Sequence, residues 1–126
     1  LKENDRKEVR LAIVESLGRT KDPSESKTLL NLLKDKDSDV IAAAARGLGH
    51  YNDAKEGLRK DIAKEMINIL DSAFNGANDP RNPTAVKKFD VIRDPMMTAL
   101  SSITGSSVGN AGEWRKWYND HKNSKW

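Results

Sequence analysis

The sequence contains no cysteine, only two histidines, and no long apolar run. Without cysteine the chain can form no disulfide, no thiolate zinc site and no cysteine nucleophile, although cysteine-free proteins occur in reducing and oxidising compartments alike. No apolar stretch approaches the roughly 18 residues that a membrane-spanning helix needs. We therefore expect a soluble protein, cytoplasmic or exported after removal of a signal segment, and the composition does not choose between these compartments.

The usual signatures of metal and cofactor sites are also absent. The acidic run that starts at Asp35 resembles the beginning of a calcium loop, but Val40 and Arg46 occupy the positions where such a loop needs glycine and glutamate. His50 and His121 lie 71 residues apart, with no HExxH motif at either one. The sequence therefore predicts no metal site.

A glycine- and serine-rich segment at 105–112 precedes a predicted helix, whose backbone amides could hold an anion. It lacks the Gly-Lys-Ser/Thr ending of a phosphate-binding loop, and no serine in the chain has the context of a nucleophile elbow. We interpret the segment as a connector. The whole pattern predicts a protein that is not an enzyme and that needs no cofactor.

One sequence unit occurs twice, with every matched pair of residues separated by 31 positions. The first copy contains Val9, Ala12, Ile13, Ser16, Leu17 and Gly18, and the second contains Val40, Ala43, Ala44, Gly47, Leu48 and Gly49. This spacing places small and apolar residues on one face of a helix, which predicts helices over about 5–18 and 38–49. The closing glycines suit a left-handed position after each helix, and the small faces permit close approach of neighbouring helices.

Between the two copies the sequence predicts another helix, over about 23–33. Asp22-Pro23-Ser24-Glu25 supplies an N-cap residue, a proline at the first position and an acid in the first turn, and leucines follow. The turn at 34–39 carries three aspartates, which we expect to cap the next helix. The repeating unit is thus helix, short turn, helix.

After the second copy the sequence predicts a long helix over about 54–74, an irregular insertion at 75–94 and a helix at 95–104. Within the insertion, residues 85–92 could form a short helix of their own. The helix at 95–104 matches the repeat again, shifted by 56 residues from Val40. A final helix at 112–123 carries Trp114, Trp117, Tyr118 and His121 at helical spacing, which is typical of a terminal cap on a single domain of residues 1–126.

Two stretches are the most specific part of this pattern: residues 32–40 leading into 43–49, and Ile103-Thr104-Gly105 followed by Trp114 and Trp117. They resemble the HEAT-repeat family, in particular short bacterial HEAT-like repeats related to those of phycobilisome-lyase-type proteins. The resemblance implies an all-α fold, a right-handed α-solenoid of antiparallel helix pairs of the HEAT or armadillo type. It also implies a protein-binding scaffold without catalytic residues.

The resemblance suggests one place for a protein or peptide partner. In this family the second helices line the concave side of the array, so a row of residues beside each repeat's leading apolar position would face the partner. The row consists of Arg10, Val14, Ile41, Ala45, Met97 and Ser101. The alternative is that Val14, Ile41 and Met97 pack between the repeats, because apolar flanks are usually buried.

A second hypothesis is a nucleic-acid-binding HEAT-like domain. Residues 81–126 hold eight Lys and Arg against four Asp and Glu, and basic and aromatic residues cluster near the end of the chain. The candidate anionic-ligand surface consists of Arg115, Lys116, Lys122 and Lys125. A third reading, a regulator or lyase acting on a tetrapyrrole protein, rests on the resemblance alone.

The first predicted helix has the pattern of the second helix of a pair, yet no preceding helix is predicted to cover it. Its apolar face, with Val9, Ala12, Ile13 and Leu17, needs such a cover. Either the chain is part of a longer array, or residues 1–6 extend this helix and another chain covers it. Self-association through this face is one form of the second possibility.

Overall fold

The computed structural model describes residues 3–20 and 22–126, and in these ranges the secondary structure is entirely helical. The elements are α1 (Glu3–Gly18), the 3-10 helix η1 (Pro23–Glu25), α2 (Ser26–Leu32), α3 (Ser38–Leu48), the 3-10 helix η2 (Gly49–Tyr51), α4 (Glu56–Ala77), α5 (Pro83–Thr104) and α6 (Glu113–His121). The predicted all-α class is confirmed. No helix in the described ranges combines the length and the apolar character that crossing a membrane requires.

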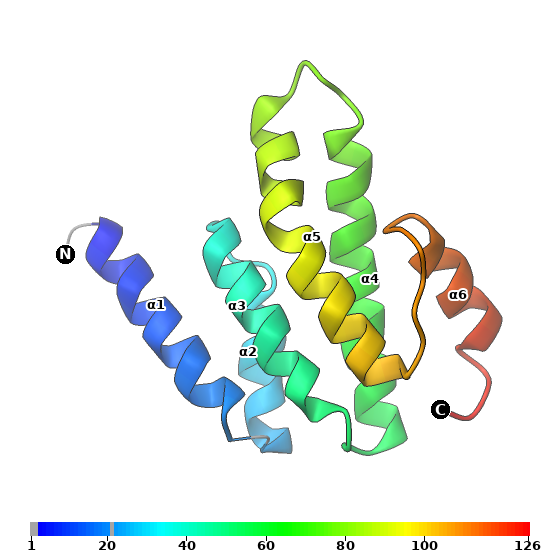
Figure 1. Ribbon diagram of the computed structural model, residues 1–126. Helices are drawn as coiled ribbons and strands as arrows, with labels where there is room; N and C mark the ends of the chain where they lie inside the picture. Colours follow the sequence, from blue (N-terminus) through cyan, green and yellow to red (C-terminus); the bar gives the residue numbers. More distant parts are fainter. Residues whose placement is uncertain (1–2, 21) are drawn as a thin grey trace.

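The helices are arranged in two layers (Figure 1). Helices α1, α3 and α5 lie side by side as one row, and α2 and α4 pack behind α3 and α5. Helix α6 packs against α4 on the far side. Most contacts therefore join a helix to its neighbours along the array, which is how a repeat protein builds a continuous core.

Small residues allow the row of helices to pack closely. At the crossing of α1 and α3, a Cβ atom built on Gly18 would lie only 3.0 Å from the Cα atom of Gly47. A Cβ on Gly49 would lie 3.3 Å from the Cα and Cβ atoms of Ala99 on α5. Both distances are shorter than ordinary van der Waals contacts, so side chains at these glycines would push the helices apart.

The closing glycines of the two repeat copies were predicted to adopt left-handed conformations, and this prediction is wrong. Gly18 is the last residue of α1, and Gly49 has φ −61°. Among the described residues Gly105, after α5, is the glycine with positive φ, at 73°. Gly18 and Gly49 are therefore explained by the close approach of a neighbouring helix rather than by backbone conformation.

The aspartates of the turn at 34–39 form ion pairs with basic residues of α1 instead of capping α3. Asp37 occupies the N-cap position of α3, but its side chain makes no capping hydrogen bond. Its carboxylate instead pairs with Arg10 of α1, and Asp35 Oδ1 lies 3.0 Å from Arg10 Nε. Lys7 Nζ donates to Asp39 Oδ2 at 2.7 Å, which raises the pKa of Lys7 above its ordinary value. The prediction that these acids cap the helix missed their partners on α1, because those partners are distant in sequence.

The predicted irregular insertion at 75–94 is largely helical. Helix α4 continues to Ala77, and α5 begins at Pro83, where the Asn82 side chain accepts a hydrogen bond from the Ala85 amide at 3.1 Å. Helix α5 then continues through Pro95, although a proline inside a helix removes one backbone hydrogen bond. Its neighbours Ile92 and Met96 are both fully buried, so packing on each side of the proline supports one continuous helix. Residues 85–92 are part of it.

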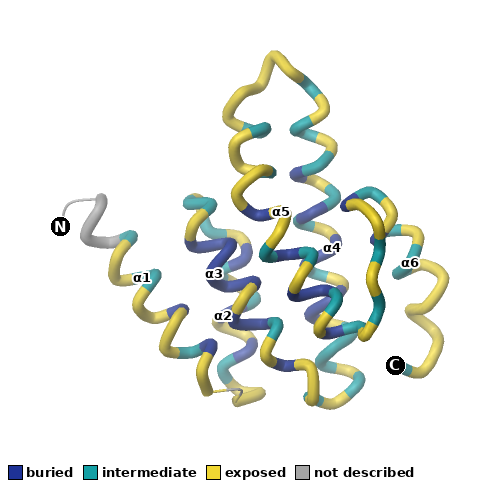
Figure 2. The backbone as a smooth tube through the Cα atoms, viewed as in Figure 1, coloured by how far each residue is buried: buried dark blue, intermediate teal, exposed yellow. Residues whose placement is uncertain are grey.

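The core lies between the two layers (Figure 2). Buried residues concentrate on α3, α4 and α5, whereas many of the described residues of α1 and the far end of the α4–α5 hairpin are exposed. The largest fully buried side chains include Leu29, Leu33, Leu48, Ile62, Met66, Ile67 and Leu70. Helix α1 thus contributes little to the core, with Val14 as its buried apolar side chain.

Helix α6 packs its aromatic residues inward. Trp114 is fully buried, and its ring meets that of Trp117 edge to face at 5.6 Å between centroids. His121 is exposed but stacks on Trp117 at 4.4 Å. The stripe therefore covers this end of the core, with His121 at its exposed margin.

Candidate functional site

Three of the six residues predicted to contact a partner lie in the core. Val14, Ile41 and Ala45 have exposed fractions of 1%, 1% and 0%. Arg10, Met97 and Ser101 are half-buried, and Met97 packs against the core. Val14, Ile41 and Ala45 therefore face neighbouring helices, which approach them more closely than sequence spacing reveals. Without separation of the helices, a partner could reach only Arg10, Met97 and Ser101 of this row.

Of the four cations of the candidate anionic-ligand surface, Arg115 is engaged within the protein and the three lysines are exposed. Arg115 Nη2 donates to Asn68 Oδ1 at 2.6 Å and lies 3.6 Å from Asp71 Oδ2, so this guanidinium belongs to the α4–α6 interface. Lys116, Lys122 and Lys125 are exposed.

The nearby aromatic rings contact one another instead of presenting free faces. Trp126 meets Trp117 at 5.3 Å between centroids, and Lys60 Nζ lies 5.6 Å from the Trp126 centroid. Glu56 accepts hydrogen bonds from Lys60 and from the Trp126 amide, and these lower the pKa of Glu56. These contacts leave little ring surface on which nucleic-acid bases could stack.

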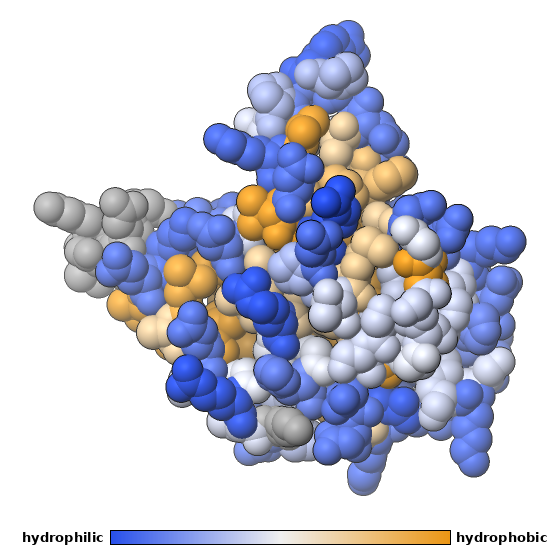
Figure 3. All heavy atoms as spheres, viewed as in Figure 1, coloured by the Kyte–Doolittle hydropathy of each residue, from blue (hydrophilic) through white to orange (hydrophobic). Residues whose placement is uncertain are grey.

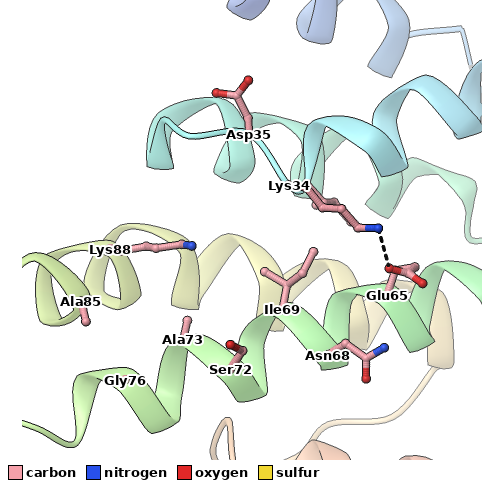
Figure 4. Close-up of a pocket in the computed structure, with 11 residues that line it drawn as sticks. Lys34, Asp35, Glu65, Asn68, Ile69, Ser72, Ala73, Gly76, Ala85 and Lys88 are labelled. Carbon is pink, nitrogen blue, oxygen red and sulfur yellow. Dashed lines mark ion pairs between the residues drawn. The ribbon is translucent and has the colours of Figure 1, made fainter.

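A groove lies where the α4–α5 hairpin rises beyond the turn between α2 and α3 (Figure 4). Its cavity volume is about 670 Å³. The turn contributes Leu33, Lys34 and Asp35, α4 contributes Glu65, Asn68, Ile69, Ser72, Ala73 and Gly76, and α5 contributes Ala85 and Lys88. The side chain of Ile69 points from α4 into the space between α4 and the turn that carries Lys34.

The groove exists because the helices differ in length. Helices α4 and α5 have 22 residues each, whereas α2 has 7 and α3 has 11, so the hairpin projects past its neighbours (Figure 1). Phe74 and Phe89 hold the projecting helices together edge to face, with centroids 5.6 Å apart. A Cβ on Gly76 would lie 3.4 Å from Ala85 Cβ, so small residues keep the two helices close.

Charges of both signs surround an apolar floor. Lys34 Nζ lies 3.9 Å from Glu65 Oε2 across the groove (Figure 4), and Asp35 is held by Arg10. Lys88 is exposed, reaches toward the same space, and makes no ion pair with any residue that the structure describes. The floor combines buried Leu33 and Ala73 with half-buried Ile69 and Ala85. An apolar centre with a polar rim is the usual anatomy of a protein-binding surface.

Sequence reasoning missed this groove because it treated 75–94 as irregular. Without a continuous α5 there is no projecting hairpin and no second wall. Asn82-Pro83 is a helix-start signal that points to the correct α5, but Pro95 competes with it. Among the side chains that the structure describes, no three from His, Cys, Asp or Glu are grouped closely enough to hold a metal ion.

Comparison with known proteins identifies the family. A family model described as HEAT repeats matches residues 1–81, which is more than half of the chain. No curated protein and no solved structure matches the chain. HEAT repeats typically serve as protein-interaction scaffolds and are generally non-catalytic. The match agrees with the packed helix pairs of the structure, and the chain belongs to the HEAT-repeat family.

Proposed function

We propose that this chain is a non-catalytic scaffold that binds a protein or peptide partner in the groove beside the α4–α5 hairpin. The observation that supports this most strongly is the groove itself, in which an apolar floor of Leu33, Ile69, Ala73 and Ala85 lies between charges of both signs. Such a surface suits a polypeptide segment, which offers apolar side chains with polar groups on either side.

The groove replaces the row of second-helix residues as the preferred site. Val14, Ile41 and Ala45 are buried in the core, so a partner could not reach them without separating helices. In the groove, Ile69 and Lys88 are accessible without any rearrangement. Pre-formed surfaces bind without the cost of reorganisation, which favours the groove.

Nucleic acid is the alternative partner, and its binding would depend on salt concentration in a different way. Binding through Lys116, Lys122 and Lys125 would depend on phosphate contacts and would weaken steeply as salt rises. Binding in an apolar groove would respond much less to salt.

The experiment uses two neighbouring charge reversals on α5. Lys88→Glu changes the groove, whereas Lys87→Glu changes an exposed lysine one position earlier that does not line it. The wild-type chain and both variants are used to capture partners from a lysate of the source organism, and a captured protein is then purified and titrated. We expect a Kd for Lys88→Glu about tenfold or more above that of the wild type, with Lys87→Glu close to the wild type.

Two results would contradict the proposal. Equal affinities of both variants for the purified partner would place the binding site elsewhere. Capture of nucleic acid that is released by salt and retained by Lys88→Glu would favour the alternative function instead.

A further inference from the structure

The residues that line the groove beside the α4–α5 hairpin offer no free backbone amide to a ligand. Those on α4, and Lys88 on α5, lie inside helices, where the amides are used in helical hydrogen bonds. The Ala85 amide donates to Asn82 Oδ1, and the amides of residues 33–35 donate to carbonyl oxygens of α2. An extended peptide therefore cannot join the groove as an added strand, because strand addition depends on free main-chain groups at an edge.

The side chains of the groove do not suit other extended ligands either. Neither an aromatic residue nor an arginine is among the described residues that line it. Aromatic walls hold proline-rich segments, and arginine clusters hold phosphorylated ones. A helix is the remaining common form of a bound segment, and it satisfies its own backbone hydrogen bonds.

The α4 wall of the groove has the shape of a seat for a helix. Its lining residues from Glu65 to Gly76 follow helical spacing, so they form one stripe along α4. The stripe is about 16 Å long, or about three helical turns. Ser72, Ala73 and Gly76 are small, and small side chains allow two helix axes to approach to about 8 Å.

The apolar side chains of the groove are recessed. Most of the surface seen in Figure 3 is hydrophilic, and the exposed large apolar side chains of the described residues, Val9, Ile13 and Val91, lie outside the groove. Inside the groove Ala73 is buried and Ile69 is half-buried. A partner must therefore project apolar side chains inward to reach the floor, as one face of an amphipathic helix does.

The charges of the rim differ between its two sides. Lys34 Nζ and Glu65 Oε2 lie 3.9 Å apart, so these two charges partly balance each other. On the α5 side, Lys88 is exposed and has no ion-pair partner in the part of the chain that the structure describes. An acidic residue of the ligand would complement this lysine.

We propose, on the basis of the function proposed above, that the partner segment is an amphipathic helix with an acidic residue that pairs with Lys88. The helix lies along the α4 stripe. Its apolar residues, spaced i, i+3 or i+4 and i+7, reach the floor at Ile69 and Ala73, and its acidic residue lies on the α5 side.

The test uses two displayed peptide libraries as probes, with peptides of about 16 residues, or between four and five helical turns. One library has a framework of alanine and glutamine, which favours a helix, and the other has proline at every third position, which keeps the peptides extended. The remaining positions are random in both. Each library is selected on the wild-type chain, and the binders are then synthesised and titrated.

Two tyrosine substitutions show whether a binder occupies the groove. Ser72 is exposed and lines the groove, whereas Asn75 is an exposed residue of the same helix that does not line it. We expect binders from the helical library whose Kd rises about tenfold or more with Ser72→Tyr and stays unchanged with Asn75→Tyr. Circular dichroism and thermal unfolding check that both variants keep the fold.

A charge exchange tests the pairing with Lys88. Replacing the acidic residue of a helical binder by lysine should raise its Kd for the wild-type chain about tenfold. Lys88→Glu should restore the affinity of this altered peptide, because the two charges are then exchanged. Lys87→Glu, on a neighbouring exposed residue outside the groove, should not restore it.

The outcomes separate this proposal from the function on which it rests. If the proline library gives groove-dependent binders of equal or higher affinity, the partner is not a helix, although the groove still binds peptides. If helical binders need no acidic residue, or if Lys88→Glu fails to restore the altered peptide, the pairing with Lys88 is wrong. If neither library gives a binder that Ser72→Tyr weakens, the groove is not a peptide site and the proposed function fails as well.

Discussion

At the scale of single residues, the contact between Gly18 and Gly47 sets how closely α1 approaches α3. A Cβ added to Gly47 would lie 3.1 Å from Gly18 Cα and 3.5 Å from the methyl groups of Leu29. Gly57, the second residue of α4, has no atom within 4 Å of such a Cβ. We predict that Gly47→Ala lowers the free energy of unfolding by about 1–3 kcal/mol through overpacking. Gly57→Ala should raise it by about 0.5–1 kcal/mol, because alanine is the better helix former.

Urea unfolding of the two variants beside the wild type measures both free energies. The pair is informative because the chemical change is the same and only the surroundings differ. An equal gain in both variants would mean that the α1–α3 contact has room for a methyl group. In that case close packing would not explain the glycine.

At the scale of the helix pair, Tyr51 connects the end of α3 to the beginning of the pair. Its hydroxyl donates to the carbonyl oxygen of Asp22 at 2.7 Å, and its side chain is almost fully buried. Burial raises the pKa of Tyr51 above its ordinary value of 10.0, because the phenolate would lose its hydration. The folded protein therefore favours the neutral phenol. The stabilisation is fully present below pH 10 and is lost as pH rises through the folded pKa.

We predict that Tyr51→Phe lowers the free energy of unfolding by about 0.5–1.5 kcal/mol at neutral pH, through loss of the hydrogen bond. As pH rises from about 10 through the folded pKa of Tyr51, the wild type should lose more stability than the variant, because the variant has no phenol to ionise at this position. Urea unfolding at a series of pH values measures the difference. If the difference in the free energy of unfolding between wild type and variant stays constant over this range, ionisation of Tyr51 does not contribute to the pH dependence of stability.

Sequence predicted α1 and α3 well because their small and apolar residues recur at helical spacing with a fixed period. It missed the continuity of α5, of which it predicted 95–104 as one helix and 85–92 as at most a separate short one, since Pro95 and the turn residues near Pro83 were given more weight than the packing that supports a continuous helix. It also predicted a partner-binding row of which the structure buries Val14, Ile41 and Ala45. Spacing shows which residues share a face, but the buried state of Ile41 and Ala45 depends on how closely the next helix approaches. That distance is a tertiary property.

At the scale of the whole molecule, burial is uneven along the row of helices. Helix α1 packs on the array on one side and exposes Val9 and Ile13 on the other, whereas α3 has helices on both sides. Local opening is easiest where few apolar contacts are lost. We predict that amide exchange is fastest in α1. It should be slowest in α3 and in the buried parts of α4 and α5, away from the projecting end of the hairpin. Native-state hydrogen exchange measures this order, and equal protection of α1 and α3 would contradict it.

The projecting hairpin also affects how such a protein could diversify. Its two helices have equal length and pack side by side, so the gain or loss of matched turns near 78–82 would leave the base of the hairpin in register. Such a change would deepen or flatten the groove while the core between the layers stays the same. Related chains could thus acquire partners of different size through changes in the length of the hairpin.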